Sequence, residues 1–129
     1  MSRCNPHVKQ NSIKETMDEL KKLVLALKAF QDLDSEMQIP TMLSYLYPCM
    51  QNPNKPLTIK QVAMKSGVKQ SSASRNVMAF TEVSRHRKEG HGLLKTEENP
   101  MFRTEKLITL TDDGENFKNK LIEILEKNE

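Results

Sequence analysis

The sequence is short of several residue types, and each shortage excludes a class of protein. It contains two cysteines, Cys4 and Cys49, and no tryptophan in 129 residues. One cysteine pair cannot supply the disulfide framework of a small secreted domain, so we expect a reducing compartment, the cytoplasm. With two tyrosines and no tryptophan, the chain is also poorly equipped to stack on single-stranded bases.

Long apolar runs are absent as well. No stretch approaches the roughly 20 apolar residues that a membrane-spanning helix needs, so we expect no membrane partner. Residues 1–10 are polar and lack the apolar core of a signal peptide. The hydrophobic content of 36% suits a single domain over residues 1–129 with a core of its own.

The residues that could carry chemistry form no catalytic or metal-binding pattern. The chain has no glycine-rich phosphate loop, no nucleophile elbow and no carboxylate pair in an apolar setting. His7, His86 and His91 have spacings that fit no zinc site. We therefore expect no enzyme, no metal and no cofactor. Cys4 is interpreted as a free terminal thiol rather than a redox switch, and Cys49 as a core residue.

Positive charge is concentrated in the middle of the chain. Residues 60–95 hold eight Lys or Arg against two Glu, a net charge of +6, whereas residues 1–59 sum to +1 and residues 96–129 to −4. A basic middle between neutral or acidic ends is typical of an element that binds a polyanion. A solvated lysine-rich face would carry the same charge, so charge alone leaves both interpretations open.

Residues 58–80 give the most informative pattern. Thr58 and Gln61 form a T-x-x-Q capping box, which starts a helix at Ile59 with Ile59, Val62 and Ala63 facing inward, and Gly67 suits the C-terminal cap of that helix. Apolar residues at positions 73, 77 and 80 predict a second helix over 70–80. Two short helices joined by a tight glycine-containing turn form a helix-turn-helix.

The second of these helices turns a short polar face outward. Such a face can enter a major groove, because hydroxyls and amides reach base edges without clashing. Arg75 is the expected base reader, through guanine, or alternatively a phosphate contact. An ordinary exposed helix face is the competing interpretation. The residues expected to contact DNA here are Lys69, Gln70, Ser71, Ser72, Ser74 and Arg75.

A hairpin is expected directly after the helix-turn-helix. Leu93 and Leu94 restart apolar structure, residues 106–111 alternate like a strand, and the polar stretch 96–102 predicts the turn between two strands. Such a hairpin is a wing. The basic loop before it either contacts DNA or is solvated, and some wing cations are ordinary surface charges. The further DNA contacts expected are Arg85, Arg87, Lys88, Lys95, Arg103 and Lys106.

Amphipathic helices are predicted at both ends of the chain. Apolar residues recur every three or four positions over 12–32 and over 112–127, where Asp112 and Asp113 suit a helix start. Another helix opens at Pro40, and Pro48 should kink or end it near Tyr47. The winged module over 55–111 has a core of its own, so we expect the end helices to form a homodimer. The expected interface residues are Ile13, Met17, Leu20, Val24, Leu27, Phe117, Leu121 and Ile124.

This order of elements resembles the MarR family of dimeric bacterial regulators. The chain has Leu57-Thr58, then Val62-Ala63, then Gly67-Val68-Lys69-Gln70-Ser71-Ser72-Ala73-Ser74-Arg75, where members often carry an LT, LA and GVSQSTVSR pattern. The later match is Leu110-Thr111-Asp112-Asp113-Gly114, against LT-x-x-G. The resemblance spans about residues 13–125 and is specific over 57–80 and 103–117. It implies a mainly α fold with a small β wing, in which the terminal helices of two chains interlock.

The sequence departs from the family pattern in three places. Lys69 replaces the usual serine cap of the recognition helix, so capping passes to Gln70 or Ser71. Residues 81–91 form a longer link to the wing, and the Asp-x-Arg signature of the wing is reduced to Arg103. The family also holds phenolic ligands between its dimer and DNA-binding parts. By that resemblance Tyr45 and Tyr47 either line a small-molecule effector pocket or simply pack in the core.

Two function classes remain. The first is a sequence-specific regulator of transcription that binds double-stranded DNA, a homodimeric repressor with its recognition helix in the major groove and its wing on the adjacent backbone or minor groove. The second is a winged-helix module whose basic face binds an acidic protein. The small polar face of the recognition helix favours the first, because protein hot spots are enriched in Trp, Tyr and Arg.

Overall fold

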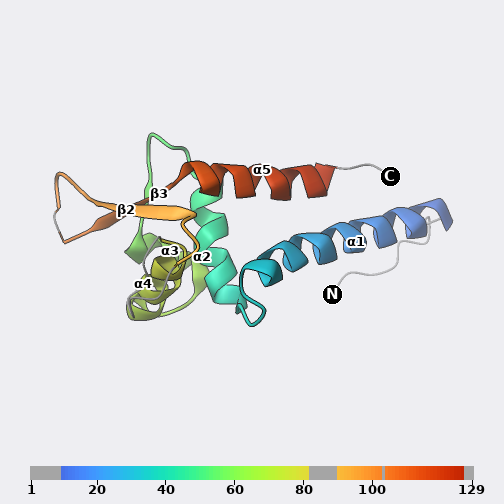
Figure 1. The fold of residues 1–129 in the computed structure, drawn as a ribbon, viewed down its shortest axis with the longest axis horizontal. Coiled ribbons are helices and arrows are strands. Elements are labelled where there is room, and N and C mark those ends of the chain that lie inside the picture. The colour runs from blue at the N-terminus through green and yellow to red at the C-terminus, as the bar shows by residue number, and fades with distance from the viewer. Residues whose placement is uncertain (1–9, 82–89, 103, 127–129) are drawn as a thin grey trace.

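The computed structural model describes residues 10–81, 90–102 and 104–126, with side chains from residue 17 onward. Helices and strands follow one another in a single order, and a three-stranded sheet accompanies the helices (Figure 1). The order is α1 (Gln10–Leu33), α2 (Ile39–Met50), β1 (Leu57–Thr58), α3 (Ile59–Ser66), α4 (Gln70–Ala79), β2 (Leu94–Glu98), β3 (Lys106–Leu110) and α5 (Asp112–Glu126). This is the predicted fold class, mainly α with a β wing.

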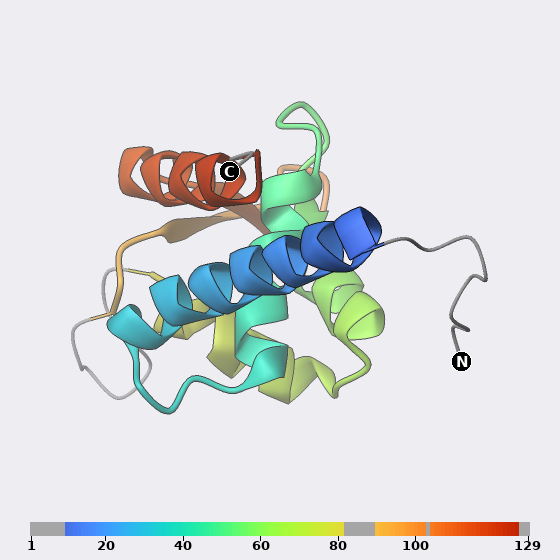
Figure 2. The same cartoon turned by 90° about the vertical axis from the view of Figure 1, so that its right-hand side faces the viewer.

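The elements separate into two ends joined by α2. At one end α3, α4 and the β2–β3 hairpin lie together, and at the other α1 and α5 project away from them (Figure 1). In the turned view α1 crosses in front of α2, with α5 on one side of the crossing (Figure 2). Among the described residues no helix is both long and apolar enough to span a bilayer.

The wing differs from its prediction at its first strand. β3 is the central strand of an antiparallel sheet with the order β1-β3-β2, and its Ile108 is paired with both Leu57 and Thr96. Residues 96–98 were expected in the turn, but they continue β2 as far as the pair formed by Glu98 and Lys106. Cross-strand pairing therefore overrides their polar composition. The two-residue strand β1 went unpredicted, because two residues are too few to show a period.

The ends of the first helix of the helix-turn-helix are confirmed in atomic detail. The Thr58 hydroxyl accepts a hydrogen bond from the Gln61 backbone N–H at 3.1 Å, and the Gln61 side chain accepts one from the Thr58 N–H at 2.9 Å. Gly67 ends the helix with φ 71°, in the left-handed region. Ile59, Val62 and Ala63 are buried as predicted. The start, the end and the buried face of α3 are therefore all predicted from neighbouring residues in the sequence.

The proline in α2 has less effect than its sequence suggests. The helix was expected to kink or end near Tyr47, but it continues through Pro48 to Met50. Pro48 is buried, and the helix closes on a bond from the Gln51 N–H to the Pro48 carbonyl at 3.2 Å. Proline has no N–H donor, so the Ser44 carbonyl loses its usual bond four residues along the helix, and burial of Pro48 offsets part of that cost.

The core is built around Tyr45, whose side chain is fully buried. Its ring lies 5.3 Å from that of Phe80, 5.5 Å from that of Phe117 and 6.0 Å from that of Phe30. Burial raises the pKa of the Tyr45 phenol, which donates a hydrogen bond to the Gly114 carbonyl. Of the two alternatives drawn from the sequence, the structure selects core packing for Tyr45.

The second tyrosine and the described cysteine sit at the edge of this core. The Tyr47 hydroxyl donates to the Lys65 carbonyl at 3.2 Å, which ties α2 to α3. Cys49 packs against the core, as expected, and burial raises the pKa of its thiol to about 11. A thiol with so high a pKa stays protonated at neutral pH and reacts slowly.

Gly114 marks the junction between α5 and the wing. A Cβ atom on it would lie 1.9 Å from the Leu93 carbonyl oxygen, so only glycine fits. The Gly114 N–H is capped by the Thr111 hydroxyl at 3.0 Å, and the same hydroxyl donates to the Gly92 carbonyl at 2.6 Å. The LT-x-x-G stretch is therefore a structural joint that fixes where α5 leaves the sheet.

The helix α1 has two apolar faces. Ala29 and Phe30 are buried, and Ala26 and Leu33 pack against the core. The predicted stripe lies on the other side of the helix, where the chain leaves it uncovered. We call it the outer face of α1; its described members Met17, Leu20, Val24 and Leu27 are all exposed, while the side chain of Ile13 lies outside the description.

The stripe predicted on α5 belongs to the core instead. Phe117 and Leu121 are buried inside the chain, and Ile124 packs against the same cluster. Phe117 meets the ring of Phe30 at 5.3 Å. Their assignment to a dimer interface stays a prediction, and the side chains of Phe117 and Leu121 leave little exposed surface for it. The amphipathic pattern correctly marked a buried face but could not say which surface buries it.

Candidate nucleic-acid interface

The second helix of the helix-turn-helix, α4, is held firmly by its inner face. Ala73, Val77 and Phe80 are fully buried, as their spacing predicted. A hydrogen bond of 3.1 Å from the Thr41 hydroxyl to the side-chain amide oxygen of Asn76 fixes α4 against α2. Together these contacts set the rotation of α4 about its axis, and this rotation decides which side chains point outward.

The outward face of α4 carries the residues that the sequence assigned to DNA. Gln70, Ser71 and Arg75 are exposed, and Ser72 and Ser74 are half-buried. The face is polar, with a single long cation, and no acidic residue stands in the first turn. A helix start without carboxylates keeps its positive dipole end available to phosphate.

The start of α4 differs in one detail from the expectation. Lys69 is the N-cap residue, with φ −66° and ψ 152°, and its side chain makes no capping hydrogen bond. The expected transfer of the cap to Gln70 or Ser71 does not occur, because both already lie at or after the first helical position. The exposed Lys69 side chain is instead free to face a ligand.

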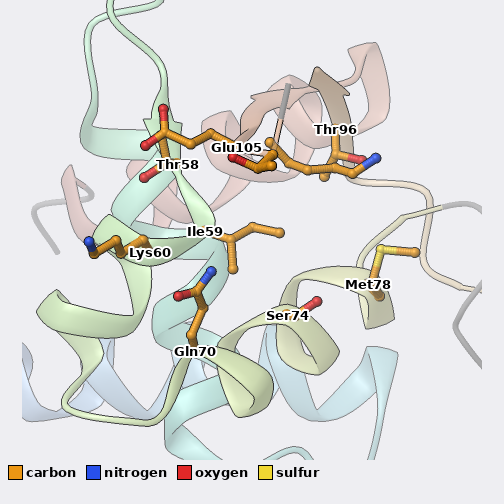
Figure 3. A pocket seen from close by; sticks show the side chains of 10 residues that line it. Thr58, Ile59, Lys60, Gln70, Ser74, Met78, Thr96 and Glu105 are labelled. Atoms are coloured by element: carbon orange, nitrogen blue, oxygen red, sulfur yellow. The ribbon is translucent and has the colours of Figure 1, made fainter. Parts of the chain in front are cut away.

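A groove separates α4 from the wing. It has a volume of about 510 Å³, and Figure 3 shows Gln70 and Ser74 of α4 facing Thr96 across it, with Lys60 at the side. Lys106 of β3 was predicted as a phosphate contact and lines the same groove. Its full lining consists of Thr58, Ile59, Lys60, Gln70, Ser74, Met78, Thr96, Thr104, Glu105 and Lys106.

Sequence reasoning missed Lys60, Thr96 and Thr104 as groove residues. Lys60 is exposed in the first turn of α3, a position that the capping box could have flagged. Thr96 had no signal of its own, since only strand pairing brings it opposite α4, and Thr104 lies in the turn that precedes β3. Glu105 also reaches the groove, where its carboxylate accepts a hydrogen bond from the Asn99 side-chain amide at 3.0 Å.

The two predicted wing lysines lie on different faces of the hairpin. Lys95 is paired with Thr109 and Lys106 with Glu98, so strand alternation turns the lysines to opposite sides. Lys106 faces the groove and Lys95 points away from it, and both are exposed. The wing also exposes Glu97 and Glu98, so its strands do not continue the positive charge of the preceding segment.

Four predicted contacts, Arg85, Arg87, Lys88 and Arg103, lie outside the described residues, as do Cys4, His7 and His86. The ring of the half-buried His91 lies 5.6 Å from that of the core residue Phe80. In the described ranges no group of three or more His, Cys, Asp or Glu side chains is placed to hold a metal ion.

Comparison with known proteins finds matches in structure but none in sequence. No family model and no curated protein matches the chain.

Solved structures match over nearly the whole chain. A mutant of MepR from S. aureus bound to an oligodeoxyribonucleotide is 14% identical with a TM-score of 0.67, and the match covers 92% of this chain and 78% of MepR. A MarR-family transcriptional regulator from a Rhodococcus species is 18% identical with a TM-score of 0.58, over 93% and 77%. The PcaV transcriptional regulator from Streptomyces coelicolor, in complex with its natural ligand, is 16% identical with a TM-score of 0.54, over 94% and 75%. The chain has the winged helix-turn-helix fold of MarR-family regulators.

Proposed function

We propose that this protein is a sequence-specific regulator of transcription that binds double-stranded DNA as a homodimer. The observation that carries the proposal is the uncovered polar face of α4, continuous with the groove that holds Lys60 and Lys106. A major groove about 12 Å wide admits such a helix, and short hydroxyl and amide side chains can reach its base edges.

The groove beside α4 suits one sugar–phosphate strand of the duplex. With α4 in the major groove of the duplex, the DNA strand that borders the major groove passes through the protein groove between α4 and the wing. There it meets the ammonium groups of Lys60 and Lys106 and the hydroxyls of Ser74, Thr96 and Thr104. Such contacts position the protein on DNA without reading its sequence. Base readout is then assigned to Gln70, Ser71 and Arg75.

The homodimer is proposed from the outer face of α1. Its leucines, valine and methionine are between 43% and 65% exposed and lie on one side of the helix, and contiguous apolar patches of this kind mark interaction sites. The surface continues onto a hollow of about 290 Å³ that Val24 and Leu27 share with Ile39 and Met42. On α5 the exposed Ile122 and Leu125 take the place of the buried residues first assigned there. A second copy of the chain is the proposed cover.

The dimer gives the proposal its geometry on DNA. Two recognition helices related by a two-fold axis lie about 34 Å apart and read an inverted repeat. A protein placed on such a site across a promoter blocks polymerase, so the proposed mode is repression. No effector is assigned, because of the two sequence candidates for a ligand pocket Tyr45 is fully buried in the core and Tyr47 ties α2 to α3 through the Lys65 carbonyl.

The experiment is a binding selection from random duplex DNA, followed by titration of the selected site at 50 to 200 mM salt. We expect an inverted repeat and an affinity that falls steeply with salt, with a log–log slope of about −0.9 per neutralised phosphate. Lys60→Ala and Lys106→Ala should each reduce the slope by about one. A flat salt response, with an acidic protein binding in place of DNA, would instead support the interaction-module alternative.

A further inference from the structure

The end of the wing is apolar and exposed. Met101 is 82% exposed and Phe102 59%, and the preceding Pro100 is exposed as well. Single apolar side chains are ordinary on a protein surface, but here three consecutive exposed residues, a proline, a methionine and a phenylalanine, lie in the loop of a hairpin. Nothing in the described part of the chain packs over them.

The backbone of this tip is held by its own hydrogen bonds. The Asn99 N–H donates to the Glu105 carbonyl at 3.0 Å, and the Glu105 N–H donates to the Phe102 carbonyl at 2.9 Å. Within the loop the Met101 N–H donates to the Asn99 side-chain oxygen at 3.0 Å, while the Asn99 amide bonds the Glu105 carboxylate. The tip therefore presents its apolar side chains on a preorganised turn, which lowers the entropic cost of using them in binding.

The position of the tip follows from the interface proposed above. The β2–β3 hairpin extends past α3 and α4 to the end of the molecule farthest from α1 and α5 (Figure 1). Suppose that α4 lies in the major groove of the duplex and that one sugar–phosphate strand lies in the protein groove between α4 and the wing. The tip of the hairpin then reaches the neighbouring minor groove of the duplex.

Charge decides what kind of contact the tip can make there. The strands just behind it expose Glu97 and Glu98, and Glu105 stands at the base of the loop. Carboxylates next to phosphates weaken electrostatic attraction, so Glu97, Glu98 and Glu105 oppose the attraction that the positive charge of Arg103 adds in the same loop. Apolar contact with base faces and deoxyribose does not depend on that charge. Phe, Met and Pro are side chains that proteins insert between base steps in the minor groove, where they kink the duplex.

We propose that Met101 and Phe102 form a wedge that enters the minor groove beside the recognition site, partly unstacks one base step and bends the duplex. This inference rests on the DNA-binding function proposed above and adds a second mode of recognition to it. A wedge favours steps that unstack easily, such as TA and CA, and so selects sequence at positions that α4 does not touch. The operator would then carry such a step flanking each half-site.

The test uses the full chain and a selected duplex with 2-aminopurine placed in turn at each step flanking the half-site. Its fluorescence rises when the base is unstacked, and energy transfer between dyes at the duplex ends reports bending. We expect enhanced fluorescence at one flanking step with the wild-type protein. Met101→Ala with Phe102→Ala should abolish that signal, reduce the bend and weaken binding about tenfold to a hundredfold, the range expected for lost base–aromatic contacts.

Two comparisons make the outcome decisive. Met50→Ala removes another exposed methionine, at the end of α2, and should leave fluorescence, bend and affinity unchanged. The salt slope should be the same for the double variant and the wild type, because the wedge neutralises no phosphate. Tight duplex binding without unstacking, or with unstacking that survives the double substitution, would overturn the wedge alone. Absence of duplex binding altogether would overturn the proposed function and the wedge with it.

Discussion

The outer face of α1 and the outward face of α4 are both helical, and the core of the chain covers neither, but their chemistry is opposite. On α1 the uncovered side chains are leucine, valine and methionine, whereas on α4 they are serine, glutamine and arginine. An apolar face gains free energy from any surface that removes it from water. A short polar face gains little unless its partner offers matching donors and acceptors. In the proposed function the same secondary structure therefore serves assembly at one end of the molecule and recognition at the other.

The largest expected effect comes from breaking the apolar side of this comparison. Leu20→Asp combined with Val24→Asp places two carboxylates on the outer face of α1, where a partner would bury them without compensation. We expect monomers in place of dimers at micromolar concentration, measured by light scattering. Affinity for the inverted repeat should fall by about 10²- to 10⁴-fold, because the second half-site is no longer tethered.

The matched control for this variant is Leu25→Asp. Leu25 is also exposed, but its helical position lies away from the stripe formed by residues 17, 20, 24 and 27. The control should remain dimeric and bind DNA normally. A wild-type monomer that bound a single half-site tightly would contradict the division of labour between α1 and α4.

The joint between the two ends gives the next largest effect. In Gly114→Ala the new methyl group would lie 1.9 Å from the Leu93 carbonyl oxygen, so backbone must move where α5 leaves the sheet. We expect the free energy of unfolding to fall by about 3 kcal/mol in urea titrations. Gly67→Ala is the comparison: nothing lies within 4 Å, and the cost there is confined to φ 71°. That variant should lose about 1 kcal/mol, and equal losses would show that Gly114 is not a steric joint.

The substitution Arg75→Ala tests the polar outward face of α4. Loss of a base contact should cost about 1–3 kcal/mol on the selected site and relax the preference at one base step per half-site. The readout is a repeated selection with the variant protein. Lys95→Ala, on the wing face turned away from the groove, should weaken all sequences alike if it changes binding at all. A uniform loss across sequences with Arg75→Ala would reassign Arg75 to a phosphate.

The smallest effect is expected at the cap of α3, which holds Lys60 at the side of the groove. Thr58→Ala removes the hydroxyl that accepts from the Gln61 N–H at 3.1 Å and should reduce unfolding free energy by about 1 kcal/mol. Thermal unfolding measures the change. Thr58→Ser keeps the oxygen and should restore most of the stability, whereas a serine variant as weak as the alanine variant would point to lost methyl packing instead.

The sequence by itself determined the elements whose cause is local. The capping box at Thr58, the left-handed Gly67 and the inward spacing of Ala73, Val77 and Phe80 specify the helix-turn-helix, because each acts within a few residues along the chain. The same local signals identified which side chains of α4 face outward. The apolar stripe on α1 was also visible, since helical periodicity needs no partner to be read.

Only the tertiary structure decided which residues that are far apart in the chain lie against one another. Periodicity marked Phe117 and Leu121 as a buried face, but only the fold shows that both pack in the core of the chain, with Phe117 against Phe30. Strand pairing extended β2 through residues 96–98, sent Lys95 and Lys106 to opposite faces and brought Thr96 across from Ser74. These outcomes depend on contacts between residues far apart in the chain, and helical periods, caps and turn residues contain no information about such distances.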